Sequence, residues 1–400
     1  MGSAQRMNET STFFIIAGES SGDRLGAALM QGLKSEHGGA INFVGVGGPL
    51  MIDQGLDSIF AMDELSVMGI AEVLPKMRQL LRRIKGTANS IESINPTALI
   101  TIDSPDFCFR VAKRAKTRLP TLRVIHYVAP SVWAWRPKRA AKMARFVNHV
   151  LTLLPFEPPY MEAEGMSCDF VGHPITAEKQ ATDAQAIEFR VEMGMASDAQ
   201  LLTLLPGSRA SEVTRLGPVF REVVERLRRD YPDLKVIIPS VASRVDLIKQ
   251  IFADVDVTIL DPTSLPSKDS EDRKRACYKT SDVALAASGT VSLELAAAET
   301  PMVIAYDMHW FTAFIKRRMV RVSTATLVNL LTDTNAVPEF LLEECTAENI
   351  YHSVKNLLES AEARDAQLAV SAKAMEALGK GGDTSGNRAA KSVLKFLNNN

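Results

Sequence analysis

The sequence predicts an α/β protein built from two successive parallel-sheet halves, and three observations lead to this prediction. Short β-rich runs alternate with amphipathic stretches along the chain, which is the pattern of parallel strands joined by crossover helices. The chain has 400 residues, and chains above about 250 to 300 residues usually divide their core. A polar stretch, ITAEKQATDAQ, separates two such series and is typical of a linker.

Strands and helices follow one another in a regular order within each half. The first half is predicted to have strands at 13–17, 41–46, 97–103, 122–128, 149–154 and 169–172. The first helix is predicted from Leu25, Leu29 and Leu33, which recur every fourth residue, with Asp23 as its N-cap. The second half is predicted to have strands at 201–205, 234–239, 257–260, 283–287 and 302–306. The predicted domains are a disordered tail at 1–12, Rossmann-like domains at 13–180 and 181–345, and C-terminal helices at 346–400 that pack back on the first domain or on a partner subunit.

Composition and charge exclude several classes of protein. Lys and Arg number 46 and Asp and Glu number 47, so the net charge of -1 argues against nucleic acid as a partner. A charged fraction of 23% with 46% hydrophobic residues argues against disorder. The four cysteines are spaced for neither a zinc site nor a disulfide scaffold, which predicts a reducing, cytoplasmic location. No apolar run approaches the ~20 residues of a membrane span.

A turn with several candidate site residues follows the first predicted strand. The segment GESSGD at 18–23 stands between a strand and a helix, where glycine permits a tight turn and helix N–H groups are free to meet a ligand. Its candidate substrate contacts are Glu19, Ser20 and Ser21. The segment also satisfies the G-x-S-x-G pattern of a hydrolase nucleophile, but that site needs an earlier strand and loop, and only one strand precedes this turn. A ligand-contacting turn or a plain turn is therefore favoured over a serine nucleophile.

Three further segments follow strands of the first half. FVGVGGP at 43–49 matches only part of a dinucleotide fingerprint, because Leu50 stands where the third glycine belongs, and NAD binding is weakly supported. Asp103 ends the strand at 97–103 and Asp106 follows it, and both are candidates for a general base, although Asp106 equally fits a helix N-cap. The loop VAPSVWAWR carries Trp135 and Arg136, which suit either core packing or contact with a sugar, an acyl chain or a phosphate.

Two strand-to-helix turns in the second half together predict a nucleotide site. In LLPGSRASE, backbone N–H groups at a helix start and an always-charged guanidinium suit a diphosphate. In ASGTVSLE, a carboxylate about one turn into the helix is placed to accept both hydroxyls of a ribose. The candidate residues are Gly207, Ser208, Arg209, Ser288, Gly289, Thr290 and Glu294.

Basic and apolar residues are concentrated in particular stretches of the chain. Residues 67–85 and 309–322 combine apolar side chains with Lys and Arg, which fits interfacial helices at a membrane but also ordinary helices packed on a sheet. Residues 73–145 contain 16 basic and three acidic side chains, a net charge of +13. The near neutrality of the chain is thus an average of a basic first domain, suited to anionic lipid and a sugar phosphate, and an acidic remainder.

The motifs in this order resemble those of the lipid-A-disaccharide synthases, a glycosyltransferase family of Gram-negative bacteria. The resemblance covers about residues 13–350 and includes GESSGD, VGVGGP, MGIAEVL, SPDF, HYVAPSVWAWRPKR, VGHP, LLPGSRASEV, ASGTVSLE and LVNLL. It implies the GT-B fold, in which two Rossmann-like domains with parallel sheets face each other across a cleft. It also implies transfer of 2,3-diacylglucosamine, with inversion, from its UDP donor to 2,3-diacylglucosamine 1-phosphate, giving lipid A disaccharide 1-phosphate and UDP.

The resemblance also implies roles for single residues. Asp103 corresponds to the aspartate favoured as base for the acceptor hydroxyl, Arg209 to an essential arginine and Glu294 to a ribose-binding glutamate. Asn329 corresponds to an asparagine of the donor region. The departing diphosphate needs positive charge, here from Arg209 and helix N-termini, so no metal and no other cofactor is expected. The implied location is peripheral, on the anionic cytoplasmic face of the inner membrane, and we further expect a homodimer through the C-terminal helices.

Other functions remain as alternatives to this one. The nearest is another GT-B enzyme acting on a UDP-sugar, either an epimerase or a transferase with a soluble acceptor, which a rate independent of acyl chains would indicate. A hydrolase based on Ser20 is a second alternative. A non-enzymatic nucleotide-binding membrane module is a third, and it leaves the carboxylates and the arginine unexplained.

Overall fold

The computed structural model describes residues 10–65, 70–196, 198–308 and 324–399, with the side chains of the helix at 70–94 described from residue 77 on. The chain forms two compact units. One contains the residues up to Ala177 together with those from Gly381 on, and the other contains Glu178–Lys380. Each unit has its own parallel sheet and its own buried apolar core, which confirms the predicted α/β architecture of two halves.

The first unit is built on a seven-stranded parallel sheet in the order β3-β2-β1-β4-β5-β6-β7. Its strands are β1 (Ser11–Ala17), β2 (Ile41–Val46), β3 (Leu56–Ser58), β4 (Ala98–Ile102), β5 (Val124–Tyr127), β6 (His149–Thr152) and β7 (Ser167–Phe170). Because β1 and β4 are neighbours in the sheet but not in the chain, the order of the strands reverses between them. In such sheets ligands bind beyond the carboxyl ends of the strands at this reversal, so these two strand ends position the site.

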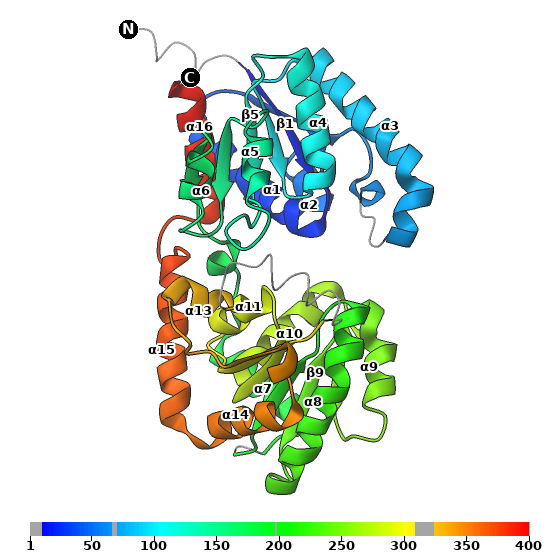
Figure 1. The fold of residues 1–400 in the computed structure, drawn as a ribbon, viewed down its shortest axis with the longest axis vertical. Coiled ribbons are helices and arrows are strands. Elements are labelled where there is room, and N and C mark those ends of the chain that lie inside the picture. Colours follow the sequence, from blue (N-terminus) through cyan, green and yellow to red (C-terminus); the bar gives the residue numbers. More distant parts are fainter. Residues whose placement is uncertain (1–9, 66–69, 197, 309–323, 400) are drawn as a thin grey trace. The chain divides into compact units, whose positions relative to one another are not determined.

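Helices cover the first sheet, and the end of the chain contributes one of them. They are α1 (Ser20–Glu36), α2 (Pro49–Asp53), α3 (Ile70–Ile94), α4 (Pro105–Arg118), α5 (Lys138–Met143), α6 (Pro158–Glu162) and α16 (Ser385–Asn399), with 3-10 turns at Met62–Glu64 and Pro174–Ala177. Helix α3 packs beside α4, and α16 packs beside α1 (Figure 1). His149 of β6 stacks on Phe396 of α16 with ring centroids 4.8 Å apart, and its Nε2 lies 2.8 Å from Ser392 Oγ. These contacts fix the C-terminal helix to the first unit.

The second unit is built on a six-stranded parallel sheet in the order β10-β9-β8-β11-β12-β13. Its strands are β8 (Leu201–Leu205), β9 (Lys235–Pro239), β10 (Thr258–Leu260), β11 (Val283–Ala287), β12 (Met302–Tyr306) and β13 (Glu339–Leu341). Its helices are α7 (Asp183–Glu192), α8 (Ala210–Asp230), α9 (Val245–Ile251), α10 (Ser267–Thr280), α11 (Val291–Ala297), α13 (Leu327–Thr332), α14 (Ala347–Glu359) and α15 (Ala361–Ala377), with 3-10 turns at Ala242–Arg244, Pro262–Ser264 and Leu342–Glu344. The neighbours β8 and β11 are central and fully buried, so the turns that follow them lie side by side.

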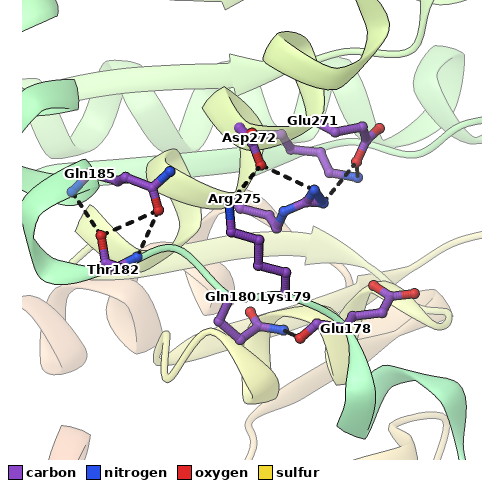
Figure 2. Close-up of polar contacts among 9 residues, drawn as sticks. Glu178, Lys179, Gln180, Thr182, Gln185, Glu271, Asp272 and Arg275 are labelled. Carbon is purple, nitrogen blue, oxygen red and sulfur yellow. Dashed lines mark hydrogen bonds and ion pairs between the residues drawn. The ribbon is translucent and has the colours of Figure 1, made fainter.

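The polar stretch predicted as a linker connects the two units and is fastened to the second (Figure 2). Lys179 Nζ lies 3.9 Å from Asp272 Oδ1 on α10. Thr182 caps α7, because its hydroxyl oxygen accepts the Gln185 N–H at 3.2 Å while Gln185 Oε1 accepts the Thr182 N–H at 3.0 Å. This capping box starts α7 at Asp183.

The predicted strands are all present, each end within two residues of its prediction. The sequence missed β3 and β13, which have three residues each and are too short for an alternating pattern to show. The prediction of Asp23 as an N-cap is wrong, because α1 begins at Ser20 and its N-cap is Glu19. Of the segment predicted as C-terminal helices, α14 and α15 belong to the second unit and α16 to the first.

Two predictions at the ends of the described ranges have a mixed outcome. Strand β1 begins at Ser11, inside the predicted tail, whose residues 1–9 lie outside the described part of the chain. The basic apolar stretch at 309–322 also lies outside it. Within the described ranges, no helix is long and apolar enough to span a membrane.

Candidate active site

The turns after β1 and β4 meet at the carboxyl edge of the first sheet. Ala17 of β1 is paired with Ile102 of β4, so both strands end at the same level. The following turns touch, since a Cβ at Gly18 would lie 2.5 Å from Ser104 Oγ, a distance that only glycine avoids. The structure thus brings the GESSGD turn beside the Asp103 turn. Glu19, Ser20 and Ser21 are exposed at this edge of the sheet.

Asp103 is held in an unusual backbone conformation at this edge. Its φ is 48° and that of Ser104 is 41°, both in the left-handed region that few residues other than glycine adopt. The Asp103 N–H donates to the Tyr127 carbonyl at 3.0 Å, which fixes the turn to β5. The side chain is half-buried, and this burial raises its pKa, while the Ser104 N–H and the Arg139 charge act in the opposite direction. A carboxylate with a raised pKa that stays accessible is suited to accept a proton.

Asp106, the other candidate base, lies apart from this arrangement. It is exposed in the first turn of α4, and the N-cap of that helix is Ser104. The prediction of Asp106 as the N-cap is therefore wrong. Asp103, which is half-buried beside the GESSGD turn, is therefore the better candidate of the two.

The loop after β5 is fixed by the tryptophan that the sequence analysis did not select. Trp133 Nε1 donates to Glu157 Oε1 at 3.1 Å, and the Leu154 N–H donates to Glu157 Oε2 at 3.1 Å. Glu157 is 3% exposed, and burial raises its pKa to about 7, against the opposing effect of these donors. Trp135 by contrast is 36% exposed, and the Arg136 guanidinium lies 4.3 Å from the centre of its ring. The pair predicted to contact substrate is thus presented at the surface by a neighbouring anchor.

The glycine-rich segment at 43–49 binds a carboxylate of the same chain, that of Asp23, where a nucleotide phosphate would otherwise bind. The Asp23 carboxylate is buried and accepts the N–H groups of Gly48 at 2.9 Å, Leu50 at 3.1 Å and Met51 at 3.0 Å. These are the N–H groups at the start of α2 that a phosphate would need. Asp23 therefore joins the first two motifs into one rigid turn, which explains the glycines without a dinucleotide.

Among the described residues, the serine of the GESSGD turn has no basic hydrogen-bond partner that would make it a nucleophile. Ser20 is exposed in the first turn of α1, and among the described residues no histidine forms a hydrogen bond with it. His126 in β5 is buried, its Nδ1 lies 2.8 Å from Thr101 Oγ1, and burial lowers its pKa to about 3. The geometry gives no support to the hydrolase alternative.

A cavity of about 420 Å³ opens at the carboxyl ends of β8, β9 and β11 in the second unit. The predicted residues that line it are Gly207, Ser208, Arg209, Ser288, Gly289, Thr290 and Glu294. The two turns meet because Leu205 of β8 is paired with Ala286 of β11. The structure therefore brings together seven of the eight second-half candidates in one pocket, which we call the α8–α11 pocket.

Its arginine is paired with a carboxylate of its own helix. Arg209 is 73% exposed, and one guanidinium nitrogen lies 2.6 Å from Glu212 Oε1. Glu212 Oε2 accepts the N–H groups of Ser208 at 3.1 Å and Arg209 at 3.2 Å. Gly207 has φ of 122°, and a Cβ there would lie 2.5 Å from Glu212 Cβ. The Glu212 carboxylate therefore occupies the N–H groups that begin α8, where an anion would bind.

A second ion pair in the pocket involves residues that the sequence analysis missed. Lys274 Nζ of α10 lies 3.5 Å from Glu294 Oε2 and 3.1 Å from Glu271 Oε2. Burial lowers the pKa of Lys274, but these two carboxylates outweigh it and the pKa is raised overall. Tyr278 of α10 also lines the pocket. The α10 sequence has the composition of an ordinary charged helix, so no motif identified these residues.

Asn329 is the predicted site residue that the structure does not bring to the pocket. It is 1% exposed in α13, where its Nδ2 donates to the Val337 carbonyl at 2.8 Å and its Oδ1 accepts the Val337 N–H at 2.9 Å. Both ends of its amide hold the chain that leads to β13. Within the described ranges, no cluster of three or more His, Cys, Asp and Glu side chains is placed to hold a metal ion.

The fold places the chain in the GT-B structural class. Two solved structures share this fold, and their low identity to the chain bears on the fold alone. The UDP-GlcNAc 2-epimerase from Neisseria meningitidis bound to UDP-GlcNAc has a TM-score of 0.63 and 12% identity, covering 98% of this chain and 100% of that one. A glycosyltransferase from Rickettsia africae has a TM-score of 0.58 and 12% identity, covering 98% of each chain.

Sequence comparison then identifies the family. A profile of the family described as lipid-A-disaccharide synthetase matches residues 13–393. The chain is 51% identical to the lipid-A-disaccharide synthase of Ruegeria pomeroyi, over 96% of this chain and 95% of that one. It is 44% identical to that of Rhodospirillum centenum, over 96% and 94% of the two chains. The chain belongs to the lipid-A-disaccharide synthase family.

Proposed function

We propose that the chain is an inverting glycosyltransferase that joins UDP-2,3-diacylglucosamine to 2,3-diacylglucosamine 1-phosphate, giving lipid A disaccharide 1-phosphate and UDP. The observation that carries this proposal is membership of the lipid-A-disaccharide synthase family over residues 13–393. The two described sites supply what such a reaction needs, a base in one unit and a charged pocket in the other. The alternative GT-B functions, an epimerase or a transferase with a soluble acceptor, are not favoured by these relatives.

Asp103 is proposed as the general base. A sugar hydroxyl is a weak nucleophile near neutral pH, so a carboxylate must take its proton as the oxygen attacks the anomeric carbon of the donor. The new carbon–oxygen bond forms as the bond from that carbon to the diphosphate breaks, and its electron pair leaves with UDP. The left-handed turn fixes the Asp103 carboxylate in place, and burial raises its pKa, which strengthens it as a base.

The α8–α11 pocket is proposed to bind the UDP part of the donor. The diphosphate would replace Glu212 as the partner of the Arg209 guanidinium and of the N–H groups of Ser208 and Arg209. The ribose hydroxyls would be accepted by Glu294, which is now paired with Lys274. Positive charge that meets the negative charge developing on the leaving group lowers the barrier to reaction. Ser288, Gly289 and Thr290 offer the start of α11 to the same ligand.

The exposed residues at the first edge are proposed as substrate contacts. Glu19, Ser20 and Ser21 lie on the turn beside Ser104, and Trp135 with Arg136 lies on the loop after β5. Asn329 is proposed as a positioning residue, because its amide fixes the loop before β13 and Ser288 Oγ donates to Ala325 in the same region. Its effect on the donor would be indirect.

The location and assembly of the protein are also proposals. The net charge of +13 over residues 73–145 supports peripheral binding to the anionic cytoplasmic face of the inner membrane. Homodimerisation through the C-terminal helices would have to leave intact the packing of α16 beside α1 within one chain. Light scattering on the full chain gives the oligomeric state.

The test of the function is incubation of the purified protein with both diacyl sugars, followed by detection of UDP and of the disaccharide by mass spectrometry. We expect both products only when both substrates are present. The matched control replaces the donor with UDP-GlcNAc, which lacks the two acyl chains. Epimerisation of UDP-GlcNAc, or transfer at equal rate without acyl chains, would instead support the alternative function.

A further inference from the structure

A second cavity, of about 640 Å³, lies wholly within the first unit between α4 and α5. Its lining includes six basic side chains, which are Arg110, Lys113, Arg136, Lys138, Arg139 and Lys142. One carboxylate, Asp106, lines it with them. We call it the α4–α5 pocket. Six like charges around one cavity repel one another, and an anion bound among them would relieve that repulsion.

Within the described part of the chain, the cations of this pocket are not paired with carboxylates, unlike those of the α8–α11 pocket. Among the described residues, no carboxylate lies within 4.0 Å of any of the six. Aromatic rings orient two of them, since the Arg136 guanidinium lies 4.3 Å from the Trp135 ring centre and that of Arg139 lies 5.8 Å from the Phe109 ring centre. A cation–π contact leaves the guanidinium edge free to donate hydrogen bonds to a ligand.

The pocket is close to the proposed base. Helix α4 begins at Pro105, two residues after Asp103, and Pro105 lines the pocket. The charge of Arg139, which also lines it, acts on the pKa of Asp103. An anion bound here would therefore sit within electrostatic reach of the group that takes the proton. Phe109, Met143 and Phe146 add an apolar part to the lining, which suits an amphiphilic ligand.

From this arrangement we infer that the α4–α5 pocket binds the phosphate monoester of the acceptor glycolipid and thereby holds the acceptor beside Asp103. The inference rests on the proposed function, because it takes the acceptor from that reaction. Six cations around one site match a phosphate monoester, which carries close to two negative charges at neutral pH. A phosphate of a membrane lipid headgroup shares this chemistry, and the experiment separates the two sources.

The test compares two double variants of the full chain. Arg110→Gln with Lys142→Gln removes two charges from the pocket, one on each helix. Arg114→Gln with Arg145→Gln removes the same charge from exposed neighbours that do not line it. We expect the pocket variant to raise the KM for the acceptor by about 10- to 100-fold, the range for losing hydrogen bonds to a charged group, with the KM for the UDP donor unchanged. The control variant should keep both values.

Two further measurements distinguish the possible failures. Binding of glucosamine 1-phosphate by calorimetry needs no turnover, so it tests the pocket even if no disaccharide forms, and we expect the pocket variant alone to lose it. With an acceptor that lacks the phosphate, wild type and pocket variant should react equally poorly. Equal acceptor KM values in the two double variants would overturn the inference. So would weaker flotation of the pocket variant with phosphatidylglycerol vesicles at an unchanged acceptor KM, which would assign the pocket to membrane lipid.

Discussion

The two strand-end sites of this chain carry their charges in opposite ways. At the edge of the first sheet, the cations of the α4–α5 pocket have no carboxylate partner among the described residues, and the candidate base is held by strained backbone. In the α8–α11 pocket, Arg209 is paired with Glu212 and Lys274 with Glu294. The first site is organised before any ligand arrives, whereas the second must exchange its internal ion pairs for those of a ligand.

The backbone shows the same difference. Four residues other than glycine have positive φ near the first edge, which are Asp103, Ser104, Val128 and Arg136. Each such residue costs about 1–3 kcal/mol and persists only where its surroundings impose it. In the lining of the α8–α11 pocket, the described residues with positive φ are the glycines at 207 and 289. Strain is therefore concentrated where we propose proton transfer, and absent where we propose nucleotide binding.

The largest expected effect comes from removing the proposed base. Asp103→Asn keeps a residue that tolerates the left-handed conformation but cannot take a proton. We expect the turnover number to fall by about 100-fold or more, with the donor KM unchanged. Because burial raises the folded-state pKa of Asp103, ionisation costs the folded state, and the variant should melt at or above the wild-type temperature at pH 8. Steady-state kinetics and thermal melts check both points.

The pH dependence of wild-type turnover sharpens this prediction. Activity needs the ionised carboxylate, so kcat/KM should fall as the pH drops through the folded-state pKa of Asp103, which lies above the ordinary aspartate value. Asp53→Asn, at the exposed end of α2, is the matched control and should keep the full rate. Wild-type turnover in Asp103→Asn would show that Asp103 is not the base, and the comparison of the two sites would then no longer hold.

The second prediction concerns the paired site. Arg209→Ala should weaken binding of UDP by about 10- to 100-fold, because a charged hydrogen-bond donor to the diphosphate is lost. Since the arginine must leave Glu212 to bind the ligand, Glu212→Gln should lower the affinity for UDP less than Arg209→Ala does. Calorimetry with UDP measures all three proteins. Arg226→Ala, on α8 but outside the pocket, is the control.

An equal UDP affinity in Arg209→Ala and wild type would show that the pocket does not hold the diphosphate. Glu294→Gln tests the ribose contact separately. This variant should bind UDP more weakly but bind inorganic diphosphate as wild type does, because only the nucleoside has the hydroxyls from which Glu294 would accept hydrogen bonds. Loss of diphosphate binding in that variant would instead mean that the Glu294–Lys274 pair supports the pocket as a whole.

The third prediction tests what makes the first edge rigid. Asp23 is 3% exposed and accepts three backbone N–H groups at the start of α2. Asp23→Ala leaves the N–H groups of Gly48 and Met51 buried without this acceptor and should lower the free energy of unfolding by about 2 kcal/mol or more. Chemical denaturation measures this, with Asp57→Ala, an exposed carboxylate on β3, as the control. An unchanged midpoint would mean that another contact holds this turn.

Most strands, and the position of most candidate site residues at strand ends, were predictable from the sequence because they rest on local patterns. A buried parallel strand is a short apolar run, and Arg209 and Glu294 stand at recognisable strand-to-helix turns. Asp23, Glu157 and Lys274 could not be predicted in the same way. Each of them has a partner 20 to 28 residues away in the chain, as Asp23 has in Met51, so only the folded arrangement shows what it holds.

The smallest expected effect concerns Glu157, which fixes the loop carrying Trp135 and Arg136. Its folded-state pKa of about 7 lies above that of an unfolded glutamate, about 4.3. Between these two values the folded state binds more protons, so stability should fall as the pH rises through this window and level off above pH 7.

Glu157→Gln removes this titration, so its melting temperature should vary less between pH 5 and pH 7.5 than that of wild type, by a few degrees. Trp133 donates to Glu157, so wild-type tryptophan emission should also shift near pH 7, and the variant should lose that shift. Glu162→Gln, exposed on α6, should behave as wild type. If the melting temperatures of Glu157→Gln and wild type change equally with pH, this carboxyl is not protonated in the folded state. The loop at the first edge would then be held by a charged group, as the α8–α11 pocket is.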